Sequence, residues 1–265
     1  MESKMWLIKA ETNLHVGNEN NSGYGIIDKA IQRDAVTSFP CINSSSLKGA
    51  INEYCTVVAD SAPEQRIRIF GADKNGKASG SQKGGVVFFD AQLLFLPVQD
   101  NDTVFKYATC LSVLNMFIDR IETMDSKFDL GEKTLKNIKD YNSLSDGDKK
   151  SLANVLTTKF GLNKPVAIKS DKEFCRLCND ENLPIIARNK LENGLSANLW
   201  YEQILPSKSV LYFFTNGSGE DTETLLDWLD NKLVQIGANA TIGYGYCRLR
   251  SYPRTKAKVE NPENR

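Results

Sequence analysis

The sequence predicts an α+β fold in which the order strand–helix–strand occurs twice along 265 residues. Three observations lead to this prediction. Short runs rich in aromatic and β-branched residues mark strands near both ends and in the middle of the chain. Stretches with apolar residues at helical spacing lie between them. Polar, glycine-containing loops separate these elements. This length suits one large domain with a substantial core.

The first half of the chain should hold one strand and one helix. Residues 5–12 form a strand, because apolar residues partly alternate there with polar ones. A polar loop follows from about 16 to 40. Residues 45–59 are expected to be helical, since serine hydroxyls can cap the start and apolar residues recur at helical spacing. The segment 71–85, rich in glycine and lysine, is expected to be a loop.

The middle of the chain begins with the continuous apolar run 85–98, which predicts a strand that Pro97 should end. Asp90 lies inside this run, so it needs a hydrogen-bonding partner or a place at a bulge. Residues 109–123 are expected to be helical. From 124 to about 164 the chain is rich in lysine and aspartate with helical character, which we interpret as an insertion without a core of its own.

The last part repeats the pattern of the first. Residues 165–206 mix short strands and turns, and 209–214 predict a strand. A helix should follow over 217–236, with acids at its start and Gly237 after its end. Residues 244–250 form the last expected strand. Without the insertion, this order is that of a ferredoxin-like (RRM-like) fold, an antiparallel sheet backed by two helices.

Composition excludes several classes of function. Lys+Arg and Asp+Glu both number 33, so any nucleic-acid surface must be local. No apolar run approaches a membrane span and no secretory signal is evident, so we expect a cytoplasmic protein. His15 is the single histidine, which rules out a two-histidine nuclease within one copy. The single CxxC pair, Cys175 and Cys178, favours reduced thiols over zinc, because a structural zinc site needs four ligands.

Two segments could bind anions, although each has an ordinary structural explanation. Ser45, Ser46 and Lys48 would place hydroxyls, helix amides and a cation together, or form only a helix cap with a surface lysine. In QIGANATIGYGYCRLR, Gly243 and Gly245 would let the backbone approach a phosphate. The arginines that follow would add positive charge, or lie on a solvated strand face.

Two further segments contain groups with several possible roles. Trp200 and Tyr201 stand beside Glu202 and offer a stacking surface next to a carboxylate. Aromatic residues in such a segment are more often packed than used for binding. Asp28 lies in the polar loop, where a lone carboxylate is usually solvated or forms a turn. Residue chemistry alone leaves both questions open.

Five segments resemble, in this order, the Cmr-type backbone subunit of type III-B CRISPR effector complexes, within the repeat-associated (RAMP) superfamily: LHVGNENNSGYGIIDKAIQRDAVTSFPCINSSSLKGA, IFG, FFDAQLLFLPV, LWYEQILP and QIGANATIGYGY. The resemblance spans roughly residues 5–252 and is least recognisable over 124–180. Two departures occur. Val36 replaces a basic or histidine residue, and SFP replaces a Gly-Phe-Pro-like turn.

The resemblance implies one RAMP domain over 1–265. Its ferredoxin-like palm would cover about 5–123 and 207–252, helical and thumb-hairpin insertions 124–206, and a flexible tail 253–265. Copies would stack head-to-tail along the CRISPR RNA with the other Cmr subunits, and each thumb would displace one nucleotide of the guide–target duplex. An open array of this kind follows from a heterologous contact that does not close.

The resemblance also implies that Asp28 is required to cut the bound target RNA, with a divalent metal such as Mg²⁺ or Mn²⁺ as its ligand. His15 and Glu202 would support catalysis. Cleavage would follow in-line attack by the 2′-hydroxyl of a displaced nucleotide and leave a cyclic phosphate. The positions implied to bind RNA are Lys48, Ser45, Ser46, Arg33, Gly243, Gly245 and Arg248.

Three other functions remain open at the level of sequence. The chain could be a backbone subunit that binds guide RNA without cutting, or the sister type III-A backbone subunit. It could also be a stand-alone guide-processing endonuclease, although the single histidine fits poorly with the acid–base sets of those enzymes. A metabolic enzyme on a ferredoxin-like fold would need a cofactor motif, and none is evident.

Overall fold

The computed structural model describes residues 1–18, 27–59, 61–72, 82–126, 128 and 141–252. Nine strands form the central sheet: β1 (Glu2–Ala10), β2 (Cys41–Ile42), β5 (Val87–Phe88), β6 (Ala91–Asp100), β7 (Val104–Cys110), β8 (Val166–Lys169), β11 (Val210–Gly217), β12 (Leu233–Gln235) and β13 (Tyr246–Tyr252). Two separate pairs are β3 (Gly71–Ala72) with β4 (Gln82–Lys83), and β9 (Ile185–Glu192) with β10 (Leu195–Gln203).

Six α-helices occur in the described residues: α1 (Ser44–Val57), α2 (Pro63–Phe70), α3 (Leu111–Thr123), α4 (Asp146–Lys159), α5 (Asp171–Cys178) and α6 (Gly219–Leu229). Helix α6 packs on β1, β11 and β13, whereas α3 contacts β6 and β7 and α4 contacts β8. None of the helices in the described segments is long and apolar enough to cross a membrane.

The sheet has the order β12–β13–β1–β11–β6–β7–β8, with β1 near its centre. Strand β1 pairs antiparallel with β11 and with β13, and its residues from Met5 to Ile8 are buried. Trp6 lies in the core, where its Nε1 donates a hydrogen bond to Thr215 Oγ1 at 3.0 Å and its ring stacks on Phe213. The indole N–H of Trp6 therefore has a hydrogen-bond acceptor inside the core.

The predicted segments 5–12, 45–59, 209–214 and 244–250 correspond to β1, α1, β11 and β13. Asp90 has the partner that its apolar surroundings require, because its Oδ1 accepts a hydrogen bond from the Ser44 backbone N at 2.6 Å. A carboxylate thus sits at the N-terminus of α1, where amides are unpaired and the helix dipole favours negative charge. The tail 253–265 lies outside the described residues.

Two predicted boundaries are wrong. Strand β6 continues past Pro97, which lies opposite Tyr107 of β7. Strand β11 pairs with β6 only as far as Phe95, so the missing Pro97 N–H removes no ladder bond on that side. Helix α6 stops at Leu229 and not near residue 236. The chain turns at Asn231, which has a φ of 57°, and continues as β12.

The sequence analysis missed β7 and four shorter strands, β2, β3, β4 and β12. Strand β7 joins β6 in antiparallel and β8 in parallel fashion, and its residues Tyr107 to Cys110 are buried. The insertion also shares the main core, because Leu152 and Leu156 of α4 and Phe160 belong to it. The insertion therefore adds β8 to the edge of the sheet and α4 to the main core, and it also contains a projecting hairpin.

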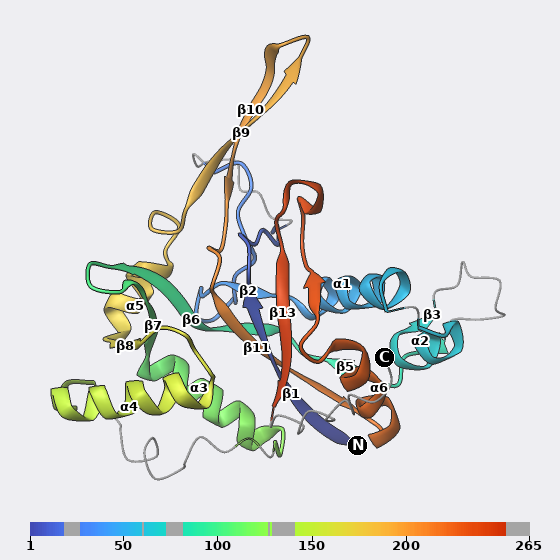
Figure 1. Cartoon of the computed structure of the whole chain (residues 1–265), viewed down its shortest axis with the longest axis horizontal. Coiled ribbons are helices and arrows are strands. Elements are labelled where there is room, and N and C mark those ends of the chain that lie inside the picture. Colours follow the sequence, from blue (N-terminus) through green and yellow to red (C-terminus); the bar gives the residue numbers. More distant parts are fainter. Residues whose placement is uncertain (19–26, 60, 73–81, 127, 129–140, 253–265) are drawn as a thin grey trace, which may run out of the picture.

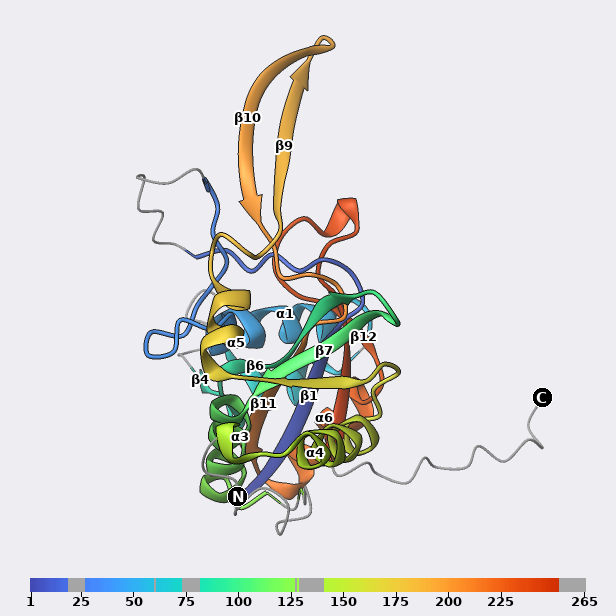
Figure 2. The same cartoon turned by 90° about the vertical axis from the view of Figure 1, so that its left-hand side faces the viewer.

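A long hairpin, β9–β10, projects away from the sheet (Figures 1 and 2). Asn193 and Gly194 form its two-residue turn, with φ values of 51° and 83°. Asn-Gly is the pair that favours such a tight hairpin turn, because both positions need positive φ. The outer residues of the hairpin are exposed on both faces of its two strands.

The six cysteines are free thiols, and Cys175 alone is exposed. Burial is the main reason that the pKa values of Cys41, Cys55 and Cys178 are raised to about 12. Since the thiolate is the reactive form, these groups should be inert in the native protein near neutral pH.

We therefore expect iodoacetamide to alkylate Cys175 first in the native protein at about pH 8. Peptide mass spectrometry after increasing exposure times measures the order. Denatured protein is the control, in which all six thiols should react at similar rates. Modification of Cys55 as fast as Cys175 in the native state would contradict the buried position of Cys55.

Candidate RNA interface and cleavage site

Asp28 is fixed at the root of the hairpin although its side chain is exposed. Its backbone N and that of Lys29 donate hydrogen bonds to the Tyr201 carbonyl, at 3.0 and 3.1 Å. Its Oδ2 accepts a hydrogen bond from the Tyr201 backbone N at 2.7 Å. Asp28 is therefore held by strand β10, and one carboxylate oxygen has no hydrogen bond to the described chain.

Glu202, the next residue of β10, has a side chain only 2% exposed. Its Oε2 accepts hydrogen bonds from Arg188 Nη1 at 3.1 Å and Asn239 Nδ2 at 2.9 Å. Its Oε1 lies 3.4 Å from His15 Nε2. A buried carboxylate needs such partners, since desolvation of an unpaired charge is costly. These four side chains, which we call the Glu202 network, join the first loop, both hairpin strands and the loop before β13.

His15 is also buried, and its Nδ1 donates to the Gln203 carbonyl at 2.7 Å. Both sequence-predicted supporting residues, His15 and Glu202, thus come together in space. They contact each other and the chain, however, and lie behind Asp28, not on the surface beside it. Their geometry suits positioning of the loop and hairpin better than direct contact with a substrate.

The glycines before β13 have different roles. Gly245 is buried with a φ of 78°, and an added Cβ would collide with the Ile236 carbonyl oxygen. Its N–H donates to the Asn13 carbonyl at 2.8 Å, which ties this loop to the first one. Gly243 is exposed, has a φ of 85° and has open space around it. Only Gly243 of this pair leaves backbone accessible to a ligand.

One terminal amide of α1 is already paired, because the Ser44 backbone N donates to the Asp90 carboxylate. Ser46 is engaged as well, since its Oγ accepts a hydrogen bond from Gln32. Ser45 and Lys48 instead line a groove of about 770 Å³ between α1 and the β3–β4 pair. Lys83 lies in the same groove, so its described lining contains two cations and no acid.

Two arginines that the resemblance implied to bind RNA make contacts within the chain. Arg33 Nη1 donates to the carbonyls of Ser38 and Cys178, both at 2.7 Å, and its Nη2 lies 2.7 Å from Asp180 Oδ1. Arg248 Nη1 donates to the Asn231 carbonyl at 2.8 Å. Cys178 and Asp180 lie far along the chain from Arg33, so short-range sequence patterns do not reveal these two contacts.

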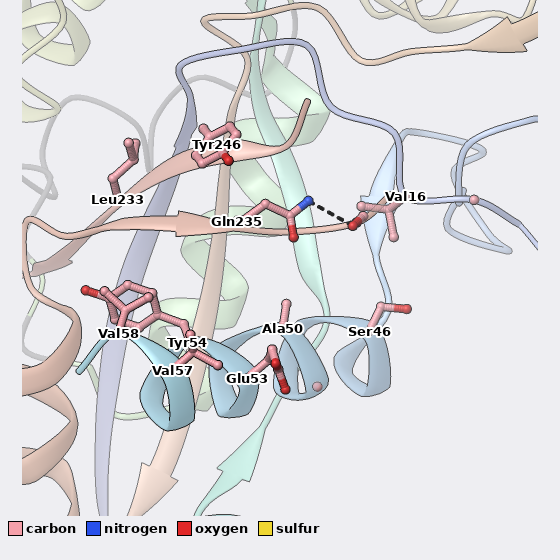
Figure 3. Close-up of a pocket in the computed structure, with 13 residues that line it drawn as sticks. Val16, Ser46, Ala50, Glu53, Tyr54, Val57, Val58, Leu233, Gln235 and Tyr246 are labelled. Atoms are coloured by element: carbon pink, nitrogen blue, oxygen red, sulfur yellow. Dashed lines mark hydrogen bonds between the residues drawn. The ribbon is translucent and has the colours of Figure 1, made fainter. Parts of the chain in front are cut away.

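A second cleft, of about 640 Å³, lies between α1 and the β12–β13 edge (Figure 3). Val57, Val58 and Leu233 form much of its wall, and Gln235 Nε2 donates to the Gly237 carbonyl at 2.9 Å. Its described lining contains Glu53 and no lysine or arginine. This cleft differs in charge from the groove that contains Lys48 and Lys83, which we call the cationic groove, and it is unsuited to a phosphate.

A model of the RAMP superfamily matches residues 7–248. The chain belongs to the RAMP superfamily. It is 27% identical to the CRISPR system Cmr endoribonuclease Cmr4 of Pyrococcus furiosus over 262 residues, which cover 85% of this chain and 88% of that protein. It is 30% identical to the CRISPR system CMR subunit Cmr4 of Saccharolobus solfataricus, over 46% of this chain and 40% of that one.

Solved structures share the fold of this RAMP chain. The oligomeric Cmr4 of Pyrococcus furiosus has a TM-score of 0.69 at 22% identity, with 95% of this chain and 98% of that one covered. A chain of the type III-B Cmr-beta complex bound to cognate target RNA has a TM-score of 0.74 at 21% identity, with 95% and 97% covered. The mixed α/β architecture with its central sheet is therefore that of Cmr4 structures.

The RAMP chain does not build a complete metal site from its own described side chains, because no group of three histidine, cysteine, aspartate or glutamate residues lies within reach of one ion. Asp28 could still contribute one ligand. Mg²⁺ commonly uses one or two carboxylates, several waters and the phosphates of a substrate. The oxygen of Asp28 that does not bind Tyr201 fits such a shared arrangement.

Alanine substitutions at Gly243 and Gly245 should distinguish the cost of a positive φ from the cost of a steric collision. Gly245→Ala should lower the free energy of unfolding by about 3–4 kcal/mol, because a positive φ and a collision with Ile236 combine. Gly243→Ala should cost about 1 kcal/mol, since only the φ is unfavourable. Urea unfolding of both variants measures the difference, and equal midpoints would contradict the assigned contacts of Gly245.

Proposed function

We propose that this chain is a backbone subunit of a type III-B (Cmr) CRISPR effector complex, which binds CRISPR RNA and cleaves complementary target RNA with Asp28. The observation that carries the proposal is the clamp at Asp28. Two hydrogen bonds between Asp28 and Tyr201, with a third from the Lys29 backbone N, fix Asp28 while its carboxylate stays exposed. Similarity to a protein named Cmr endoribonuclease supports the cleavage activity.

The assembly would consist of copies of the chain, other Cmr subunits, CRISPR RNA and target RNA. Strands β13, β1, β11 and β6 with helices α1 and α6 would form the ferredoxin-like palm, and β9–β10 the thumb. The fold shared with an oligomeric Cmr4 and with a chain of a target-bound complex supports this arrangement. An exposed hairpin that stands away from the sheet suits contacts with RNA and with a neighbouring copy.

Asp28 would act on a nucleotide displaced from the duplex. The 2′-hydroxyl oxygen attacks the adjacent phosphorus and the P–O5′ bond breaks, which gives a 2′,3′-cyclic phosphate and a 5′-hydroxyl. The proton of the 2′-hydroxyl passes to the Asp28 carboxylate, and the departing O5′ takes a proton from water. A divalent cation, Mg²⁺ or Mn²⁺, held by Asp28 and the RNA would supply charge stabilisation at the phosphate. The tie to Tyr201 limits the motion of the carboxylate during this reaction.

The Glu202 network would position this carboxylate. Glu202 pairs by its backbone with Lys29, directly after Asp28, and its side chain is anchored by Arg188, Asn239 and His15. A shift of β10 would move Tyr201 and therefore Asp28. We accordingly assign His15 and Glu202 a positioning role, which revises the supporting catalytic role implied by the resemblance.

The cationic groove beside α1 would hold RNA phosphates. Lys48 and Lys83 supply charge, and Ser45 supplies a hydroxyl. The exposed Gly243 would let the backbone of its loop approach the RNA closely. A local basic groove on a chain with no net charge agrees with a subunit that binds RNA on one side and protein on others.

A backbone subunit that binds RNA without cutting it is the second candidate. The observation in its favour is the lack of any three-residue acidic or histidine cluster in the described part of the chain. The sister type III-A backbone subunit would have the same overall plan. Cleavage measurements on the assembled complex distinguish a cutting subunit from a scaffold.

Two substitutions of Asp28 test the catalytic assignment. Asp28→Asn keeps an acceptor for the Tyr201 N–H but removes the charge, whereas Asp28→Ala removes both. Both should reduce target cleavage by about 10²–10⁴-fold, with guide and target binding unchanged. Cleavage is followed in the reconstituted guide-loaded complex, and EDTA should abolish it.

Asp102→Asn, on the exposed β6–β7 turn, is the matched control and should cut at the wild-type rate. Asp28→Asn with wild-type cleavage would overturn the catalytic role of Asp28. A wild-type complex that binds complementary target and never cuts would favour the scaffold.

Lys48 and Arg33 should respond differently to replacement by alanine. Lys48→Ala should lower the slope of log affinity for RNA against log salt by about 1, with stability unchanged. Arg33→Ala should lower the free energy of unfolding by about 1–3 kcal/mol, because it removes two hydrogen bonds and leaves the carbonyl of the buried Cys178 unpaired. RNA binding at several salt concentrations measures the slope, and urea unfolding measures the stability. A stability loss in Lys48→Ala with a changed slope only in Arg33→Ala would contradict these roles.

A further inference from the structure

We propose that Trp200, Tyr244, Arg188 and Lys29 form a binding site for one unstacked nucleotide of the target strand, beside Asp28. This inference rests on the proposed function and names the group that receives the displaced nucleotide. We call these four residues the hairpin-root platform. They come from three different parts of the chain, namely the first loop, the hairpin and the loop before β13.

The four side chains of the platform are close together. Lys29 Nζ lies 5.1 Å from the centre of the Trp200 ring. The Arg188 guanidinium carbon lies 5.7 Å from the Trp200 ring centre and 5.9 Å from that of Tyr244. Trp200 and Tyr244 are half-buried, so part of each ring is accessible. Bases stack on aromatic rings and on arginine planes, and lysine can pair with the phosphate of the same nucleotide.

The two faces of the hairpin differ in chemistry. Trp200 lies directly opposite Arg188 in the strand pairing, so both side chains lie on one face. Lys190 alternates onto that same face. The other face carries Ile185, Ala187, Asn189 and Leu191 from β9 and Leu199 and Tyr201 from β10. No cation occurs on that face in the described hairpin, so the charge is confined to the side that bears Trp200.

The platform is preorganised. Arg188 Nη1 is held by the buried Glu202 carboxylate, which fixes its guanidinium near both rings. Figure 2 shows the loop between β12 and β13, which carries Tyr244, next to the root of the hairpin. Arg188 therefore loses little further conformational entropy when RNA binds.

Two observations point to a ligand. Trp200 Nε1 is shielded from solvent and has no hydrogen-bond partner among the described residues, and a buried donor without an acceptor is the kind of group that a bound molecule completes. In addition, Lys29 directly follows Asp28. A nucleotide that stacks on the platform would therefore place its phosphates near the Asp28 carboxylate.

The test uses the guide-loaded complex with 2-aminopurine scanned, one position at a time, through the target RNA. An unstacked 2-aminopurine is bright, and stacking on an indole quenches it. At the displaced position, Trp200→Ala should raise the fluorescence severalfold over wild type and slow cleavage about tenfold. Trp200→Phe keeps a ring and should restore both. Leu199→Ala, on the opposite face of the same strand, should change neither.

Three results would overturn the site. These are an unchanged signal at every target position in Trp200→Ala, an equal change in Leu199→Ala, or a response seen only with 2-aminopurine in the guide strand. If Asp28→Asn abolishes cleavage while Trp200→Ala leaves signal and rate unchanged, the platform fails and the proposed function stands. If the fluorescence responds but no complex cuts, the platform stands and the cleavage activity fails.

Discussion

The buried Glu202 carboxylate is the interaction on which the rest of this surface depends. A charge inside a protein is tolerated only when it is paired, and Glu202 meets this requirement with groups from three other segments. Those segments are the first loop, through His15, strand β9, through Arg188, and the loop before β13, through Asn239. Backbone hydrogen bonds also hold these segments, and the shared contact with Glu202 links their side chains to one another.

This constraint divides the surface into two layers. The inner layer contains Glu202, His15 and Gly245, which contact other parts of the chain and determine where the loops lie. The outer layer contains Asp28 and Gly243, which are exposed and free to meet a ligand. Gly243 and Gly245 stand two positions apart in one motif and belong to different layers, because the chain packs around Gly245 and leaves Gly243 open. Motif membership therefore does not specify which residue touches the substrate.

The two clefts beside α1 differ in the charges that line them. Asp90 places a negative charge at the start of the helix, where it accepts a hydrogen bond from the Ser44 amide. Positive charge is found instead on the flank of the helix that carries Lys48, in the groove shared with Lys83. The cleft on the β12–β13 side is walled largely by apolar residues and contains Glu53. One helix thus separates a surface suited to phosphate from one unsuited to it.

The sequence by itself determined the elements whose signals are local. Periodicity located β1 and α1, and motif order located Asp28 and the glycine loop. Only the tertiary structure decided what Arg33, Gly245 and Glu202 do, and it revealed the partners Arg188 and Tyr244. The physical reason is that these roles depend on contacts between distant residues. Asp28 and Tyr201, for example, are 173 positions apart. No spacing rule within one segment encodes such a contact, because the fold creates it.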